Sequence, residues 1–373
     1  MLADRRTFLT GAAFSGVAFL SGTNYSKAVD ISPPSQMIDV SKEVSVAAAY
    51  AKNPKGLYFP PGDYMLPKEG LEIDSGAVWR GDRARLILPA GSTAPAIRTK
   101  RFAELKGSKK AEGPHGFVLD GLLIDANGGP YCAQLYGSGY QILGCDFIGW
   151  RVAGISSEWG EGGEIPMEAH IERFRVYGGY GTAGIEWAGP HDSTFVNGEV
   201  WTLEHGHKMD YAIRTFGNAI GERFIGVHTW GRHDVGYCLE RETYLGMCTA
   251  EGAFEANVWF KAKNCQMIGG TIFHAGADVP TVGIRFGIEG AQSGVDSCEV
   301  NGVKMHNFHG NARPLHYANS WGNRVSIVLR SGGATALSSA WKGSPAGSDV
   351  IDIFCTDNPA LSMVRDLRPR MAK

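Results

Sequence analysis

The segment NGVKMHNFHG, residues 301–310, decides how this chain folds. A glycine is followed by alternating apolar and polar residues, and then by a turn that holds a histidine and a second glycine. Similar segments recur as LGCDFIGW (143–150), NGEVWTLEHG (197–206), IGVHTWGRHD (225–234) and IGGTIFHAG (268–276). The recurrence predicts a repeated structural unit rather than one isolated turn.

The repeat has a loose period when the segments are aligned on their glycine. The aligned positions are Gly121, Gly144, Arg173, Gly198, Gly226, Gly269 and Gly302. One interval, of 43 residues between Gly226 and Gly269, is long enough for an extended turn or an additional irregular coil. Each period also holds a second short alternating segment, such as AGIEWAG (183–189) or YAIRTFG (211–217). Short strands at this spacing predict an all-β solenoid, a parallel β-helix whose coils stack ~4.8 Å apart.

The composition agrees with a turn-rich β protein and excludes some functions. Glycine accounts for 51 of 373 residues, without a collagen period or a low-complexity tract. The formal net charge is −2, from 36 basic and 38 acidic side chains. We therefore expect no nucleic-acid partner. The seven cysteines show no C-x-x-C spacing, so we expect neither a metal site nor a cofactor.

The N-terminal segment predicts export. Paired arginines in DRRTFLTG (4–11) precede the apolar run AAFSGVAFL, and Ser-Lys-Ala at 26–28 offers a small-x-small cleavage site. The pattern resembles a twin-arginine signal, with an ordinary secretory signal as the alternative. We expect residues 1–28 to be this signal, and the mature protein to be periplasmic or secreted with no membrane-spanning segment.

A capping segment and two strand-turn motifs carry a family resemblance. SKEVSVAAAYAKN (41–53) is a candidate amphipathic capping helix, with Val44, Ala47, Ala48 and Tyr50 on one face. With the following GLYFPPGDYML (56–66) and LDGLLIDANG (119–128), it resembles the pectin-lyase-like right-handed parallel β-helix superfamily. That superfamily includes pectate lyases, polygalacturonase-type glycosidases and phage tailspike depolymerases. The resemblance implies a right-handed β-helix over residues 29–345 and a C-terminal cover or tail over 346–373.

Strand alternation predicts where functional side chains gather. The residues expected to point inward are Ile155, Ile185, Ile213 and Ile284. The residues that follow them would form an external column of Ser156, Glu186, Arg214 and Arg285, with Glu240 and Lys261 on the same sheet. The alternative is a surface ladder of opposite charges, each pair contributing ~0.2–1 kcal/mol.

The turns before these strands are rich in histidine and aspartate, and they flank the same face. The candidates there are His207, Asp210, Arg232, His233, Asp234 and His274. Histidine suits proton transfer near neutral pH, although a turn histidine can also be merely solvated and a turn aspartate can satisfy backbone amides. Trp187 and Trp230 are candidate platforms for sugar rings.

These residues support three functions, with a polysaccharide or oligosaccharide as the partner, which for a lyase would be acidic. A lyase acting by β-elimination would use Arg214, Arg232 and Arg285 as cations. It would use His233 or His207 as the base, oriented by Asp234 or Glu240. A glycoside hydrolase would use two carboxylates such as Glu186 and Glu240, about 6.5–9.5 Å apart for inversion. A non-catalytic binding or envelope protein would use the same groove, including His207, Asp210, His274, Arg285 and Lys261, only to hold the polymer.

Overall fold

The computed structural model describes residues 36–107, 112–159, 168–203, 206–274, 281–291, 294–308, 312–330, 341–342, 349–356 and 362–366. The predicted export signal lies outside these residues, as does His309 of the opening segment. No helix in the described part of the chain is long and apolar enough to cross a membrane.

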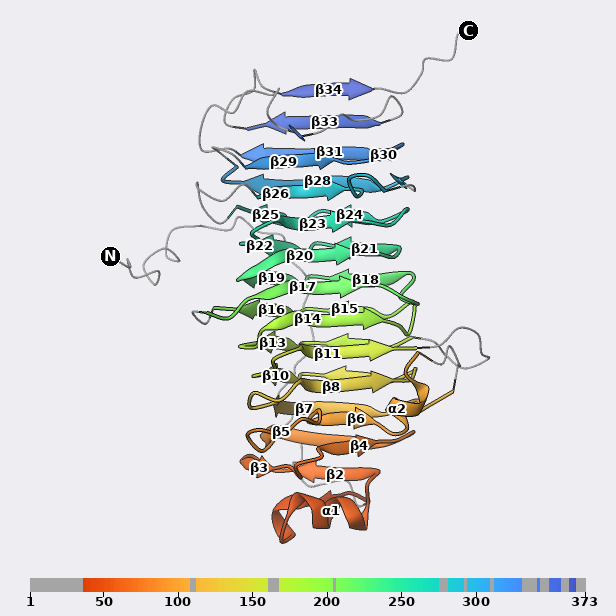
Figure 1. The fold of residues 1–373 in the computed structure, drawn as a ribbon, viewed down its shortest axis with the longest axis vertical. Coiled ribbons are helices and arrows are strands. Elements are labelled where there is room, and N and C mark those ends of the chain that lie inside the picture. Colours follow the sequence, from red (N-terminus) through yellow and green to blue (C-terminus); the bar gives the residue numbers. More distant parts are fainter. Residues whose placement is uncertain are drawn as a thin grey trace, which may run out of the picture.

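The chain is an all-β, right-handed parallel β-helix, as the repeat and the resemblance predicted. The coils stack along one axis, with a short helix at one end and the strand β34 at the other (Figure 1). An 11-stranded sheet takes one strand from each coil. Its strands are β4 (Leu71–Ile73), β6 (Ile97–Thr99), β8 (Tyr131–Tyr136), β11 (Ala153–Glu158), β14 (Gly181–Ala188), β17 (Met209–Thr215), β20 (His233–Leu239), β23 (Ala256–Phe260), β26 (Val282–Phe286), β29 (Arg313–Tyr317) and β32 (Trp341–Lys342). We call it the long sheet.

The second sheet has 21 strands and closes the other sides of each coil. Four long strands span two sides: β5 (Val78–Ile87), β7 (Val118–Asp125), β28 (Glu299–His306) and β31 (Arg324–Arg330). Between them the sheet divides into two ladders. One contains β9 (Gln141–Leu143), β12 (His170–Glu172), β15 (Thr194–Val196), β18 (Glu222–Ile225), β21 (Thr243–Gly246) and β24 (Gln266–Ile268). The other contains β10 (Asp146–Ile148), β13 (Arg175–Tyr177), β16 (Glu199–Thr202), β19 (His228–Gly231), β22 (Thr249–Glu251) and β25 (Thr271–Phe273).

The remaining elements lie at the ends of the solenoid and at one corner. At the N-terminal end are β1 (Ile38–Asp39), η2 (Val40–Lys42), α1 (Val46–Lys52), β2 (Gly56–Phe59) and β3 (Asp63–Met65), and α2 (Phe102–Leu105) follows β6. A two-stranded pairing joins β27 (Val295–Asp296) to β30 (Ser320–Trp321). Within the segment predicted as a tail, β33 (Val350–Cys355) pairs in parallel with β31, and β34 (Met363–Asp366) pairs antiparallel with β33.

The capping helix is present, but its buried face differs from the prediction. Ser45 is the N-cap, because its hydroxyl accepts a hydrogen bond from the Ala48 amide at 3.1 Å. The helix therefore begins after Val44, which is 96% exposed, and buries Val46 and Ala49 instead. Of the predicted face, Tyr50 packs against the core, but Val44 lies before the helix and Ala47 is exposed, because the prediction placed the start of the helix too early.

The inward isoleucine column is confirmed. Ile155 pairs with Ile185 and Ile185 with Ile213 in successive coils, and all three are fully buried. The same column continues through Tyr237 and Val258 to Ile284. Apolar side chains stacked in this way form one continuous core along the axis.

The repeated glycine marks a corner that requires a left-handed backbone. Glycine supplies this conformation at most coils, for example Gly144 with φ 60° and Gly226 with φ 63°. Arg173 (φ 52°), Asn197 (φ 52°) and Met247 (φ 54°) occupy the equivalent place in other coils. Met247 resolves the 43-residue interval, which contains one additional regular coil. Asn197, rather than its neighbour Gly198, is the corner residue of its coil.

Candidate functional site

The outward side chains of the long sheet form a single column along the axis. In coil order the column is Arg98, Gln134, Ser156, Glu186, Arg214, Cys238, Trp259, Arg285 and His316. Glu186 and Arg214 are direct neighbours, as alternation predicted. Cys238 and Trp259 separate Arg214 from Arg285, because two coils lie between them.

Glu240 is held between two cations from neighbouring coils. Arg214 donates from Nε and Nη2 to its two carboxylate oxygens, each at 3.2 Å, and Lys261 Nζ lies 3.3 Å from Oε1. Burial alone would raise the pKa of Glu240, but the Arg214 hydrogen bonds and the charges of Arg214 and Lys261 outweigh it and lower the pKa. Glu240 is therefore a fixed anion at neutral pH.

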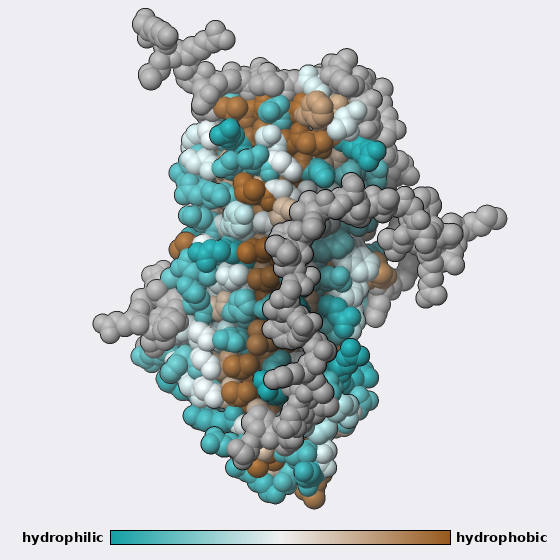
Figure 2. Space-filling model, turned by 180° about the vertical axis from the view of Figure 1, so that it is seen from behind, coloured by the Kyte–Doolittle hydropathy of each residue, from teal (hydrophilic) through white to brown (hydrophobic). Residues whose placement is uncertain are grey.

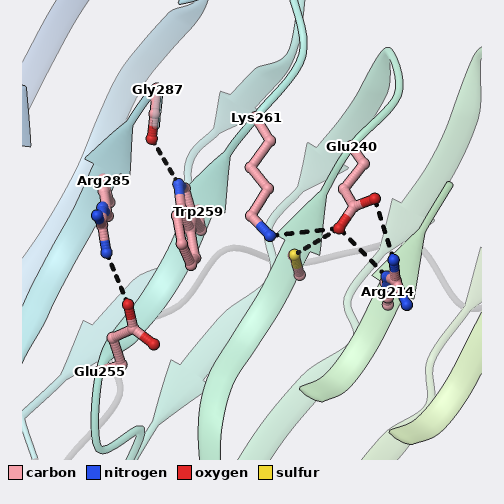
Figure 3. A network of polar contacts seen from close by, with 8 residues as sticks. Arg214, Glu240, Glu255, Trp259, Lys261, Arg285 and Gly287 are labelled. Atoms are coloured by element: carbon pink, nitrogen blue, oxygen red, sulfur yellow. Dashed lines mark hydrogen bonds and ion pairs between the residues drawn. The ribbon is translucent and has the colours of Figure 1, made fainter. Parts of the chain in front are cut away.

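Trp259 lies between two cations, those of Lys261 and Arg285 (Figure 3). Lys261 Nζ and the Arg285 guanidinium carbon each lie 4.1 Å from a ring centroid of Trp259, within the range of cation–π attraction. The indole is fixed because its Nε1 donates to the Gly287 carbonyl at 2.7 Å. Arg285 also donates from Nη1 to Glu255 at 2.6 Å. The indole thus fixes the positions of two cations on the outer face.

The same face holds Arg214 against aromatic rings. Its guanidinium carbon lies 4.5 Å from the centroid of Phe216 and 5.3 Å from that of Tyr211. We call Arg214, Lys261 and Arg285 the cation row. Their side chains are 26%, 13% and 14% exposed, so each charge is partly desolvated but still reaches solvent.

Glu186 lies at one end of the cation row and differs from Glu240. Burial raises the pKa of Glu186, and the charges of Arg214 and Lys106 offset this only in part. Glu186 forms no hydrogen bond or ion pair with the described residues. Arg214 lies between Glu186 and Glu240, whose Cα atoms we place ~12 Å apart from the spacing of coils and residues.

The structure corrects the predicted position of His233. It is the first residue of β20, in register with Met209, and is fully buried rather than exposed in a turn. Burial, with a smaller contribution from the charge of His228, lowers the pKa of His233 to about 3. Its neighbour Asp234 cannot orient the imidazole, because it points outward and binds Lys208 Nζ at 2.7 Å. A base at this place is not accessible to a polymer outside the solenoid.

Two other predicted binding residues also lie inside. Trp187 is fully buried, and its Nε1 donates to the Pro190 carbonyl at 3.0 Å. His274 is 4% exposed, with its ring 5.6 Å from that of Phe308. Both side chains were expected to be exposed, which was wrong, because they occupy positions that face the core of the solenoid.

The remaining candidates lie at the corner that precedes the long-sheet strands. Arg232 donates from Nε to the His207 carbonyl at 3.2 Å, and the His207 ring is 4.5 Å from that of Tyr180. Asp210 is exposed on β17. These residues lie beside the starts of the strands that carry the cation row, and their roles stay predictions.

Trp230 belongs to a different face. It follows Trp201 and Tyr177 in a column on the outside of the second sheet. The Tyr177 and Trp201 rings are 4.5 Å apart and 4° from parallel, and those of Trp201 and Trp230 are 5.2 Å apart and 13° from parallel. Because the rings cover one another's faces, the middle of this stack offers only edges to a ligand.

Part of the outside of the second sheet is apolar. Ile225 is 38% exposed and Met247 69% exposed. Seen from behind, apolar side chains are aligned along the axis (Figure 2).

Sequence reasoning missed Trp259, the residue that organises the cation row. The strand NVWFKAK (257–263) was recognisable from its alternation. Trp259 shares the outward face of Lys261, two residues later, but its place beside Arg285 follows only from the register of β23 and β26. The described residues contain no group of three histidine, cysteine, aspartate or glutamate side chains that could hold a metal ion.

Comparison with known proteins gives structural matches alone. No family model matches the chain, and no curated protein matches its sequence. The N-terminal fragment of gene product 12 of bacteriophage Phi29 superposes with a TM-score of 0.50 at 11% identity, covering 80% of this chain. This chain spans 61% of that fragment.

Two structures of PfbA, a surface adhesin of Streptococcus pneumoniae, have TM-scores of 0.45 and 0.49 at 10% and 13% identity. They cover 85% and 86% of this chain and 88% and 97% of their own. At such identities a match with a TM-score of 0.50 shows a fold and not a function. The chain is a right-handed parallel β-helix, similar in fold to the phage protein fragment.

Proposed function

We propose that this protein binds an acidic polysaccharide along the outer face of its long sheet. The observation that carries the proposal is the cation row, in which aromatic rings hold Arg214, Lys261 and Arg285 in fixed positions. Only two carboxylates, Glu240 and Glu255, form ion pairs with the row among the described residues. The row therefore has three cations to two ion-paired carboxylates, with Glu186 beside Arg214 but not paired with it.

The arrangement favours a polymer over a small anion. Successive coils present a new side chain every ~4.8 Å, so the row is a rigid linear array along the axis. Pre-positioned cations also lose little side-chain entropy on binding.

Binding is tested by titrating the purified full chain with polygalacturonate, with neutral dextran as the comparison polymer. Lys261→Ala and Arg285→Ala each remove a charge-assisted contact of ~1.5–3 kcal/mol, or about 10–100-fold in Kd. Arg175→Ala is the matched control, because Arg175 also forms an ion pair, with Asp146, but on the second sheet. Equal affinity for dextran, or an equal loss in the control, would refute the proposal.

A second candidate function is cleavage of the bound polymer. The pKa of Glu186 is raised and that of Glu240 is lowered, which favours this function, since carboxyl groups with separated pKa values often serve as the acid and the base of one reaction. Glu186 would protonate the glycosidic oxygen, and Glu240 would stabilise positive charge or activate water. Inversion needs the carboxyl groups about 6.5–9.5 Å apart, so both side chains would have to lean toward each other.

The β-elimination expected from the sequence stays a prediction and requires a base other than His233. The three outcomes separate in one assay of polymer incubated with the protein. Reducing ends alone indicate hydrolysis, and an ultraviolet-absorbing unsaturated product indicates elimination. Binding without either product indicates a non-catalytic protein. For hydrolysis, Glu186→Gln should abolish product formation and leave polymer binding within about twofold; retained turnover would exclude Glu186 as the acid.

Export to the periplasm or outside the cell is part of the same proposal. The paired Arg5 and Arg6 support it. Replacing both by lysine should prevent removal of the segment before position 29, which N-terminal sequencing of the cell-associated protein would detect. Normal processing of that variant would contradict twin-arginine export.

A further inference from the structure

The aromatic stack on the second sheet has an end that opens into a cavity. Along the column, Tyr177 is followed away from Trp201 by Ile148 and then by Asp125. An isoleucine side chain is shorter than a tyrosine ring, so the outer part of the Tyr177 ring extends beyond Ile148. A cavity of about 370 Å³ lies there, bounded by Arg85, Asp125, Ile148, Tyr177, Tyr180 and His207. Tyr177 is thus the one ring of the stack that lines this cavity.

The polar side of the cavity is fixed by Asp125. Its side chain is 6% exposed, and its Oδ2 accepts from Arg85 Nε at 3.1 Å and Nη2 at 2.5 Å. Its Oδ1 accepts a hydrogen bond from the backbone N–H of Asn127 at 2.7 Å. Gly149 allows this close approach, because a Cβ there would lie 2.9 Å from Asp125 Oδ1. A buried, fully bonded carboxylate of this kind is a rigid element of the cavity wall.

Several hydrogen-bonding groups in the wall are still available. Arg85 Nη1 and the hydroxyls of Tyr177 and Tyr180 form no hydrogen bond with the described residues. Tyr180 is 38% exposed and packs against the His207 ring at 4.5 Å. One aromatic face together with a few donors and acceptors is the usual composition of a small-molecule site.

The charge of the cavity selects the kind of ligand. Arg85 and Asp125 neutralise each other, so the wall attracts neither an anion nor a cation strongly. This distinguishes the cavity from the cation row, which lies on the long sheet. A pyranose ring matches the cavity, because its C–H face packs on an aromatic ring and its hydroxyls both donate and accept hydrogen bonds.

We propose that this cavity binds the ring of an uncharged sugar, stacked on Tyr177 and hydrogen-bonded to Arg85 and Tyr180. The site is separate from the proposed polyanion-binding face, and it does not depend on that function. A polymer with both acidic and neutral units could occupy the two sites, whereas a purely acidic one would use only the cation row.

The test is saturation-transfer NMR of the full chain with D-glucose, D-galactose, D-mannose and N-acetyl-D-glucosamine. At least one of the four should receive saturation from the protein. Tyr177→Ala should weaken binding of that sugar about tenfold or more, since it removes the stacking face. Because Tyr177→Ala also shortens the aromatic stack, Tyr180→Ala provides a second variant outside the stack, with a loss expected in the same direction.

Two controls separate this site from others. Tyr244→Ala removes a partly exposed tyrosine from β21, and Arg285→Ala removes a member of the cation row; neither should change sugar binding. Absence of transfer to all four sugars would overturn the proposal. So would binding that survives both cavity variants, or that is lost in either control. Failure of polygalacturonate binding would bear on the cation row alone.

Discussion

Replacing His233 should change how the stability of this protein depends on pH. The imidazole is fully buried, and neither ring nitrogen has a hydrogen-bond partner among the described residues. Its pKa is lowered to about 3, from about 6.5 in an unfolded chain. Between these values the unfolded chain binds a proton that the folded chain does not. Stability is therefore lost as pH falls below about 6.5.

The size of the effect follows from the two pKa values. Relative to pH 7, this group lowers the free energy of unfolding by about 2 kcal/mol at pH 5 and by about 4 kcal/mol at pH 3. His233→Leu fills a similar volume and removes the titration. The variant should be about as stable as the wild type at pH 7, because exchanging an unpaired buried polar group for an apolar one is close to neutral or favourable.

The measurement is urea unfolding of both proteins at pH 7 and pH 5, followed by tryptophan fluorescence. From pH 7 to pH 5 the unfolding free energy of the wild type should fall by about 2 kcal/mol more than that of His233→Leu. The slope of unfolding free energy against urea concentration should stay the same. His115→Gln, at an exposed position, should behave as the wild type. Parallel pH dependence of the wild type and His233→Leu would refute the burial of a neutral imidazole. A large loss of stability in the variant at pH 7 would indicate partners for the ring.

Three further predictions concern other parts of the solenoid. Burial raises the pKa of Glu222 well above its usual value, only partly offset by the Ser193 amide, so the contribution of this carboxyl to stability should fall as pH rises above about 4.5, opposite in sign to that of His233. Glu222→Gln should remove this contribution. If urea unfolding gave the variant and the wild type the same change in unfolding free energy between pH 5 and pH 7, the prediction would be contradicted. Ile213→Ala should cost about 2–5 kcal/mol and the outward Ile225→Ala about 0.5 kcal/mol or less in the same assay, and similar losses would show that the register is wrong. Cys238 is buried and its pKa is raised to about 12, so a thiol reagent at pH 8 should label it only after unfolding, whereas rapid labelling of the native protein would disprove its burial.

The sequence by itself determined the architecture, because the features that build a coil are local. Alternating apolar residues specify which side of a strand faces the core, and the recurring corner specifies where the chain turns. The stacking of Ile155, Ile185 and Ile213, and the outward position of Glu186 beside Arg214, followed from these patterns alone. The corner at Met247 escaped detection because only its left-handed backbone, and not its side chain, resembles the glycines.

Only the tertiary structure decided which side chains meet. Strand periodicity is two, so a shift of one residue moves a side chain from the outside to the core. His233 was placed wrongly because β20 begins at His233, within the segment expected to be a turn, so the imidazole continues the inward positions of the strand and enters the core. The cation row depended on the same register. Lys261 shares the outer face with Trp259 because the two residues are two apart in the chain, whereas Arg285 becomes a neighbour of Trp259 only through the register of β23 and β26.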